Sequence, residues 1–139
     1  MEVRSYFPGD EAGIVDVWNE YLYRDPVTLE VFERKVLLDP NFNPDGCIVA
    51  LAGGRVESFI LALKRAYPLF HDGLQPETGW ITSFAVSRAL RGKGVEDILV
   101  EKALAFLRAR GAREVWFSCY TPNYFFPGVD VEAYGDLHA

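Results

Sequence analysis

The sequence predicts one mixed domain of the α/β class, in its α+β form, on the basis of length, composition and pattern. The chain has 139 residues, which suits a single domain with a sizeable core. Apolar residues make up 50% of the chain and charged residues 24%, as in a typical globular protein. Strand-like and helix-like segments are interspersed, and no repeat or linker separates them. We therefore take residues 1–139 as a single domain.

The first part of the chain predicts a strand followed by two helices. Residues 2–7 have a strand-like pattern and end at a Pro-Gly pair. Asp10 can cap the first helix, whose apolar residues recur at helical spacing up to an Asp-Pro break. Thr28 can cap the second helix. The residues expected on the apolar face of this second helix are Leu29, Phe32, Val36 and Leu37.

The middle of the chain predicts a sheet. Residues 47–52 and 55–63 are β-rich runs joined by Gly53-Gly54, and two glycines accept the positive φ angles of a tight hairpin turn. After a loop, residues 80–87 form another β-rich run.

A helix and a strand are expected in the last third of the chain. The segment from about 95 to 110 has an apolar stripe, acidic residues in its first turn, arginines in its last turn and a glycine at its end. Residues 113–120 predict a strand, and residues 129–139 predict the beginning of a further helix.

Charge and composition argue against several classes of function. The 20 acidic and 14 basic residues give a net charge of -6, which disfavours a nucleic-acid-binding protein. No apolar run approaches the roughly 20 residues that span a membrane, and no signal peptide is recognised, so we expect a cytoplasmic protein. Cys47 and Cys119 lack metal-ligand spacing and are expected to be reduced thiols. His71 and His138 are expected on the surface, and no metal site is predicted.

The basic glycine loop Arg91–Gly94 lies directly before the helix at 95–110. The first amides of a helix have no intrahelical partner, and its dipole favours an anion there. Glycines allow a ligand to approach the backbone, and Arg91 and Lys93 add positive charge. The loop therefore suits a phosphate or pyrophosphate, although a solvated turn has the same composition. Its spacing matches neither a P-loop nor a dinucleotide fingerprint.

The segment FAVSRALRGKGVEDILVEKALAFLRARGAREVWFSC, residues 84–119, resembles the acyl-CoA-binding motif of the GNAT acetyltransferase family. That motif consists of a strand, R-G-x-G-x-G/A, a long amphipathic helix and another strand. Residues 47–63 resemble the second and third strands of the same family. The resemblance covers nearly the whole chain. It implies a mixed, mostly antiparallel sheet flanked by helices, with acetyl-CoA as the cosubstrate and no metal.

The resemblance also implies which residues bind the cosubstrate. The loop and helix start would hold the pyrophosphate, and the preceding strand would pair with pantetheine. A backbone N–H near Val86 would polarise the thioester carbonyl, on which charge grows as the amine attacks directly. The residues to which these roles fall are Phe84, Ala85, Val86, Arg91, Gly92, Lys93, Gly94, Val95, Glu96 and Asn123.

Candidate catalytic residues are Glu57, Tyr124 and Tyr134. The family often places a glutamate on its fourth strand, where this sequence has none, so Glu57 on the neighbouring strand is the candidate base. A solvent-exposed Glu57 is the alternative. Either tyrosine could protonate the departing thiolate, or both could serve only in packing. The acceptor would be a small-molecule or peptide amine, and the negative chain would favour a cationic one.

Three departures from the family pattern leave alternatives open. Glu96 replaces the last Gly or Ala of the motif, and its carboxylate would either oppose the pyrophosphate or complement the helix dipole. Arg88 replaces a frequent proline. The sequence ends at Ala139, before the expected remainder of the last helix and two strands. We therefore expect a truncated or minimal domain with a sheet edge that could form a homodimer. The alternative function is an inactive GNAT-like interaction or regulatory domain.

Overall fold

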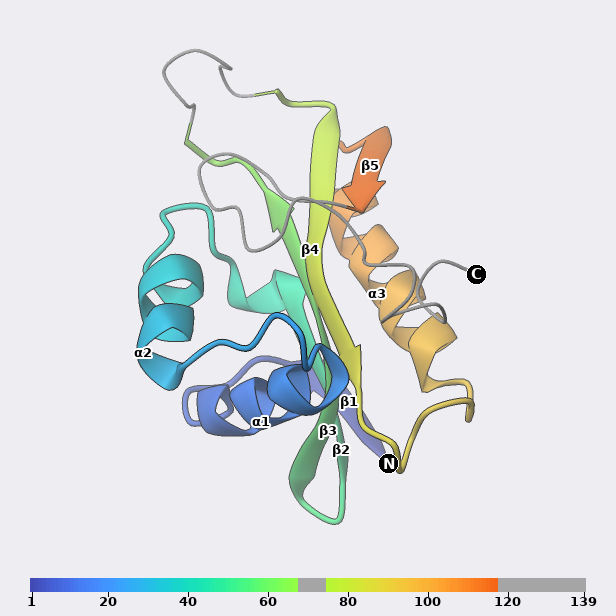
Figure 1. Ribbon diagram of the computed structural model, residues 1–139. Coiled ribbons are helices and arrows are strands. Elements are labelled where there is room, and N and C mark those ends of the chain that lie inside the picture. Colours follow the sequence, from blue (N-terminus) through green and yellow to red (C-terminus); the bar gives the residue numbers. More distant parts are fainter. Residues whose placement is uncertain (68–74, 118–139) are drawn as a thin grey trace.

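The chain folds around a single twisted sheet in the order β1-β2-β3-β4-β5. The structure, a computed structural model, describes residues 1–67 and 75–117 (Figure 1). Within these residues the elements are β1 Glu2–Ser5, α1 Glu11–Tyr21, α2 Leu29–Phe32, a π-helical turn Glu33–Leu37, a 3-10 turn Pro44–Gly46, β2 Cys47–Ala52, β3 Arg55–Lys64, β4 Thr78–Val86, α3 Val95–Ala109 and β5 Glu114–Phe117.

The sheet is antiparallel from β1 to β4, and β5 pairs with β4 in parallel. The parallel pair requires a crossover, which α3 supplies between the two strands. The predicted mixed, mostly antiparallel sheet is therefore confirmed, as are the hairpin and the helix near 95–110. At the hairpin, Gly53 and Gly54 both have positive φ, at 61° and 76°.

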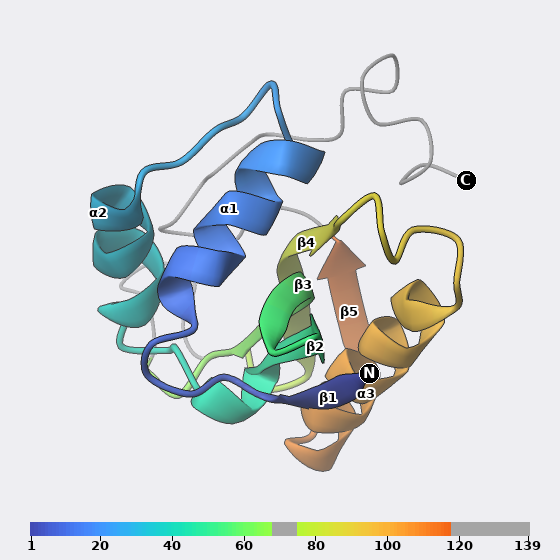
Figure 2. The same ribbon diagram turned by 90° about the horizontal axis from the view of Figure 1, so that it is seen from below.

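Helices cover both faces of the sheet, with α1 and α2 on one side and α3 on the other (Figure 2). On the first side, the Trp18 ring stacks on Phe59 of β3 with 5.9 Å between centroids and meets Phe32 edge-on. On the second side, α3 buries Leu99 and Leu107 against the sheet. Each face of β3 is thus packed against a helix, which fixes β4 beside it.

Two details of the first helices differ from the sequence prediction. Thr28 caps α2 as expected, since its Oγ1 accepts a hydrogen bond from the Val31 N–H at 3.1 Å. Asp10 precedes α1 but makes no capping bond to it, because its carboxylate instead accepts from Arg4 and from the Phe7 N–H. Leu29 does not join the buried face of α2 and is 41% exposed. The π-helical turn that follows shifts the buried face toward Phe32 and Val36.

Gly46 lies where the start of β2 packs against both β3 and α3. A Cβ at this position would lie 2.5 Å from the Ala62 carbonyl oxygen and 2.8 Å from the Phe106 ring. The backbone of Ala62 leaves no room for a side chain at position 46. The absence of a Cβ there lets the Phe106 ring, and with it α3, pack closely against the start of β2.

Gly46→Ala should therefore lower the free energy of unfolding by about 2–3 kcal/mol, as overpacking of a filled core does. Urea unfolding measures the change. Adding Phe106→Leu should not restore stability, because the tightest contact is with the backbone of Ala62. A Gly46→Ala protein as stable as the parent would contradict this packing.

The Asp10 carboxyl joins β1 to α1 electrostatically. Burial tends to raise its pKa, but the hydrogen bonds from Arg4, at 2.7 and 3.0 Å, and from the Phe7 N–H outweigh burial and lower the pKa below its ordinary value of 3.8. A depressed folded-state pKa contributes stability above the ordinary value, and that contribution is lost as the pH falls through the folded value.

Asp10→Asn should lower the free energy of unfolding by about 1.5 kcal/mol at pH 7, because a hydrogen-bonded charge pair is lost. The difference from the parent should shrink as the pH falls below about 4. Urea titrations between pH 3 and pH 7 measure both effects. Asp16→Asn is the matched control, since Asp16 is exposed on α1. Equal losses in the two variants would argue against the role of Arg4.

Candidate active site

Beyond its pairing with the described part of β5, β4 continues to Val86 with no described strand on its outer edge, and we call this region the fork. The two strands pair from Thr78 to Ile81 on β4, opposite Glu114 to Phe117 on β5. Just beyond, the register between β3 and β4 shifts, because Leu61 faces Ser83 whereas the next residue of β3 faces Ile81. The shift leaves Thr82 as an extra residue, a β-bulge. Within the described chain, β4 from Thr82 onward has a strand on its β3 side only, and β5 lies beside the upper part of β4 (Figure 1).

The free edge of β4 presents backbone hydrogen-bonding groups to this fork. The Ser87 N–H donates to the Glu57 carbonyl oxygen at 2.8 Å, while Val86 lies opposite Ser58. In an antiparallel ladder this arrangement makes Val86 and Ser58 a non-hydrogen-bonded pair, so the N–H and C=O of Val86 point away from β3. The same holds two residues earlier, at Phe84. A ligand along this edge finds alternating donors and acceptors.

The glycine loop carries the chain from the fork to α3. Its first turn is closed by hydrogen bonds from the Leu90 and Arg91 N–H groups to the Ser87 carbonyl oxygen, at 3.2 and 3.0 Å. Gly92 and Gly94 then have φ angles of 77° and 87°, which glycine adopts without strain. The chain enters α3 directly after this turn, and the amides of the first turn of α3 point back toward the loop.

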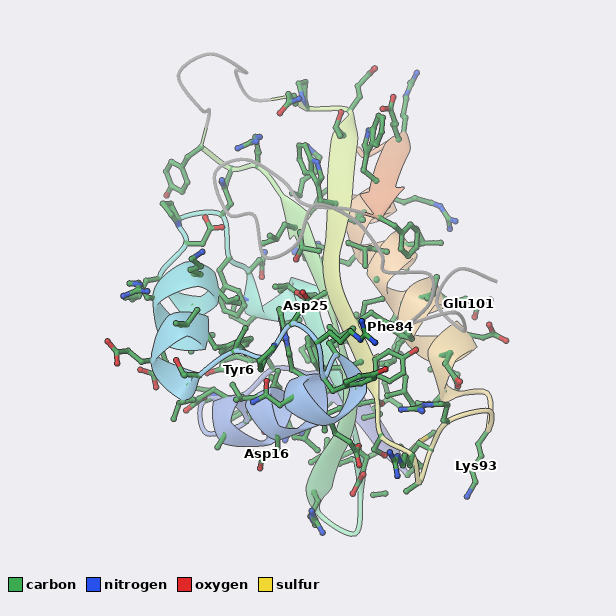
Figure 3. All side chains as sticks on the ribbon, in the orientation of Figure 1. Tyr6, Asp16, Asp25, Phe84, Lys93 and Glu101 are labelled. Carbon is green, nitrogen blue, oxygen red and sulfur yellow. The ribbon has the colours of Figure 1, made fainter. Side chains whose placement is uncertain are left out.

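Glu96 turns its carboxylate into this loop. Its Oε2 accepts a hydrogen bond from the Gly92 N–H at 2.8 Å. Its Oε1 is buried and has no hydrogen-bond partner in the part of the chain that the structure describes. The carboxylate is therefore directed inward at the start of α3, against an amide of the proposed anion site. Lys93, by contrast, extends outward from the tip of the loop (Figure 3).

Arg91 turns its guanidinium toward β4. The Nη2 group donates to the Val86 carbonyl oxygen at 3.1 Å, and the guanidinium carbon lies 4.6 Å from the centre of the Tyr21 ring. Tyr21, at the end of α1, meets Phe84 edge-on at 6.2 Å. A cation–π contact and a hydrogen bond thus hold Arg91 beside the fork. The sequence analysis did not single out Tyr21, because it looks like one more apolar residue of the α1 stripe.

The structure brings most of the proposed cosubstrate-binding residues together. Phe84 and Val86 lie on the free edge of β4, and residues 91–96 follow at the start of α3. Ala85 is different, because its side chain is fully buried and its backbone groups face β3. Ala85 therefore shapes the strand without offering a hydrogen bond to a ligand in the fork.

Glu57 belongs to a different hollow. Its side chain lines a cavity of about 420 Å³ between α1 and the β2–β3 hairpin, together with Asp16 and Glu20. The residues of the fork and the glycine loop do not line this cavity. Asn123, Tyr124 and Tyr134 lie outside the described residues, as does the helix expected at 129–139.

Cys47 is buried in the core between the sheet and α1. Burial, with a smaller effect from the charge of Asp10, raises the pKa of its thiol to about 12. A thiol in this environment is not a nucleophile at neutral pH, since the thiolate is the reactive form.

Thiol-labelling reagents should therefore modify Cys47 only as the protein unfolds. Peptide-level mass spectrometry after iodoacetamide treatment measures the rate at this residue, and urea should accelerate labelling in step with unfolding. Rapid labelling of Cys47 in native buffer would contradict its burial.

β4 runs through a glycine loop into α3, within a mixed sheet that has helices on both faces, as in the fold of GNAT acetyltransferases. The chain belongs to the acetyltransferase (GNAT) family, whose model matches residues 10–125. Family membership identifies this as an acetyltransferase domain of a family that generally uses acetyl-CoA. No protein of curated function matches the sequence closely enough to count as a relative.

Solved structures support the same fold. A GCN5-related N-acetyltransferase from Sphaerobacter thermophilus is 26% identical over 82% of this chain, with a TM-score of 0.66. Ard1 from Thermoplasma volcanium is 19% identical over 80% of the chain, with a TM-score of 0.60. A ribosomal-protein-alanine N-acetyltransferase from Brucella melitensis biovar Abortus 2308 is 15% identical over 88%, with a TM-score of 0.61. The matched region spans 34%, 66% and 83% of these three chains.

Within residues 1–67 and 75–117, none of the helices has the length and hydropathy to cross a membrane. Likewise, no group of three or more His, Cys, Asp or Glu side chains in these residues could hold a metal ion.

Proposed function

We propose that this domain transfers an acetyl group from acetyl-CoA to a primary amine by direct attack. The observation that carries the proposal is the free edge of β4, which leads through Gly92 and Gly94 into the N-terminus of α3. This edge offers backbone groups to an amide-containing arm, and the helix start offers amides and a positive dipole to a diphosphate.

Each part of the site would make a different contact. The pyrophosphate would lie against the amides of residues 92–96, and pantetheine would pair with the outward backbone groups of Phe84 and Val86. The outward N–H of Val86 would donate to the thioester oxygen, where negative charge develops in the transition state. One well-placed donor of this kind is typically worth about 3 kcal/mol.

Starting from the ammonium form, two protons must leave the nitrogen, one before the attack and one after it, and one proton must reach the departing sulfur. The neutral amine nitrogen attacks the carbonyl carbon, a C–N bond forms, the C–S bond breaks, and the CoA thiolate takes up a proton. A lysine-like amine has an ordinary pKa near 10.4, so a base assists the first step. Glu57 lies one strand away from the fork, so it would act through intervening water. Tyr124 and Tyr134 remain the proposed acids, and a cationic acceptor suits the negative chain.

One observation favours a second candidate function. Because the Glu96 carboxylate contacts the Gly92 amide, an anion of the chain itself occupies part of the proposed anion site. A GNAT-like domain that no longer binds acetyl-CoA would act as an interaction or regulatory module. Direct measurement of CoA binding separates the two functions.

Gly94→Val should weaken CoA binding at least tenfold. Valine is strained at a φ of 87° by roughly 1–2 kcal/mol, and its side chain would stand where a ligand approaches the backbone. Isothermal titration calorimetry with CoA measures the affinity.

Gly54→Val is the matched control, because Gly54 also has positive φ, at 76°, and lies in the hairpin away from the fork. It should lose similar stability but keep its CoA affinity. If both variants weakened CoA binding equally, the loss would reflect lower protein stability and not the position of Gly94 in the loop. Millimolar CoA giving neither heat nor thermal stabilisation of the parent would overturn the proposed function.

A further inference from the structure

Two contacts from the chain itself fill the two ends of the proposed acetyl-CoA slot. At the loop, the Glu96 carboxylate accepts from the Gly92 N–H. At the strand, the Arg91 guanidinium donates to the outward carbonyl oxygen of Val86. The Glu96 carboxylate therefore lies at the loop, where the diphosphate would bind. The Arg91 guanidinium binds the Val86 carbonyl oxygen, which could otherwise accept a hydrogen bond from an amide of pantetheine.

Arg91 and Glu96 each contact a backbone group and do not contact each other. Arg91 and Glu96 carry opposite charges and lie five positions apart, yet no ion pair forms between them in the described structure. Each side chain contacts a backbone group instead, and both groups belong to the proposed binding surface.

The Glu96 contact is incompatible with a bound diphosphate. A phosphate oxygen at the Gly92 amide would compete for the same N–H and would meet a carboxylate at close range. Like charges at such a separation repel each other, most strongly where solvent is excluded. The side chain must therefore move away before the diphosphate takes its place.

We propose that Glu96 is an internal competitor of the cosubstrate. Together with Arg91 it holds the proposed acetyl-CoA site closed, and it must swing out for acetyl-CoA to bind. This inference rests on the proposed function, since it concerns the same site. When Glu96 leaves the Gly92 amide and pantetheine takes the Val86 carbonyl, the Arg91 guanidinium is released toward the diphosphate. The chain's own charges thereby set the affinity for the cosubstrate.

Variants at Glu96 test the competition. Glu96→Ala removes both the competing acceptor and its charge, so it should bind CoA and inorganic pyrophosphate about tenfold more tightly than the parent. Glu96→Gln keeps an acceptor without charge, and its affinity should fall between the two. Asp97→Ala is the matched control, because Asp97 is an exposed acid of the same first turn and accepts no hydrogen bond among the described residues. Its affinity should stay within about twofold of the parent.

A second measurement reports the contact without any ligand. Hydrogen exchange at the Gly92 amide, followed by NMR, should be faster in Glu96→Ala than in the parent and unchanged in Asp97→Ala. The protected amide is the direct signature of the carboxylate contact.

The combined outcomes separate the two proposals. Tighter CoA binding with faster Gly92 exchange in Glu96→Ala supports the competition. A parent that binds CoA while Glu96→Ala binds no more tightly overturns the competition and leaves the proposed function standing. Failure of every variant to bind CoA overturns the proposed function. Unchanged Gly92 exchange in Glu96→Ala separately refutes the internal contact.

Discussion

The free edge of β4 is the constraint on which the rest of the site depends. Among residues 1–67 and 75–117, no strand lies beside the outward N–H and C=O groups of Phe84 and Val86, since the described β5 pairs with β4 only up to Ile81. Backbone groups need hydrogen-bond partners, and a strand fixed between packed layers cannot turn to find them. The packing of α1 and α3 against β3 thus creates an edge suited to a ligand that carries its own amides.

Side chains of the chain itself meet part of this need. Arg91 supplies a donor to Val86, and Glu96 supplies an acceptor to Gly92. Tyr21 connects this arrangement to α1, since it contacts both Arg91 and Phe84. Under the proposed competition, Arg91 and Glu96 would serve two arrangements, one closed and one open to the cosubstrate. The affinity for the cosubstrate would then depend on the free-energy difference between the closed and open arrangements, and not only on the contacts made in the open one.

The local sequence pattern predicted most helices and strands, because turn residues and the spacing of apolar residues within a short segment determine them. The glycine pair made the β2–β3 hairpin evident, and the end of β4 and the whole of α3 were evident from alternation and helical spacing. Asp10 lies at the N-cap of α1 as predicted, but its side chain does not cap the helix, because Arg4 binds the carboxylate through a tertiary contact. The inward turn of Glu96, the partner of Arg91 and the position of Glu57 depend on packing and register in the same way. The family resemblance located the loop, and only the fold revealed how its side chains fill it.

The backbone amides that respond to CoA test the central claim most directly. In an NMR titration of the isotopically labelled protein, we expect the largest shifts at the amides of Phe84, Val86 and residues 92–96, because these groups face the fork and the loop. The side chain of Glu57 lines the cavity beside α1, so amides there should change little. Shifts confined to that cavity, or absent at saturating CoA, would contradict a cosubstrate site on the free edge of β4.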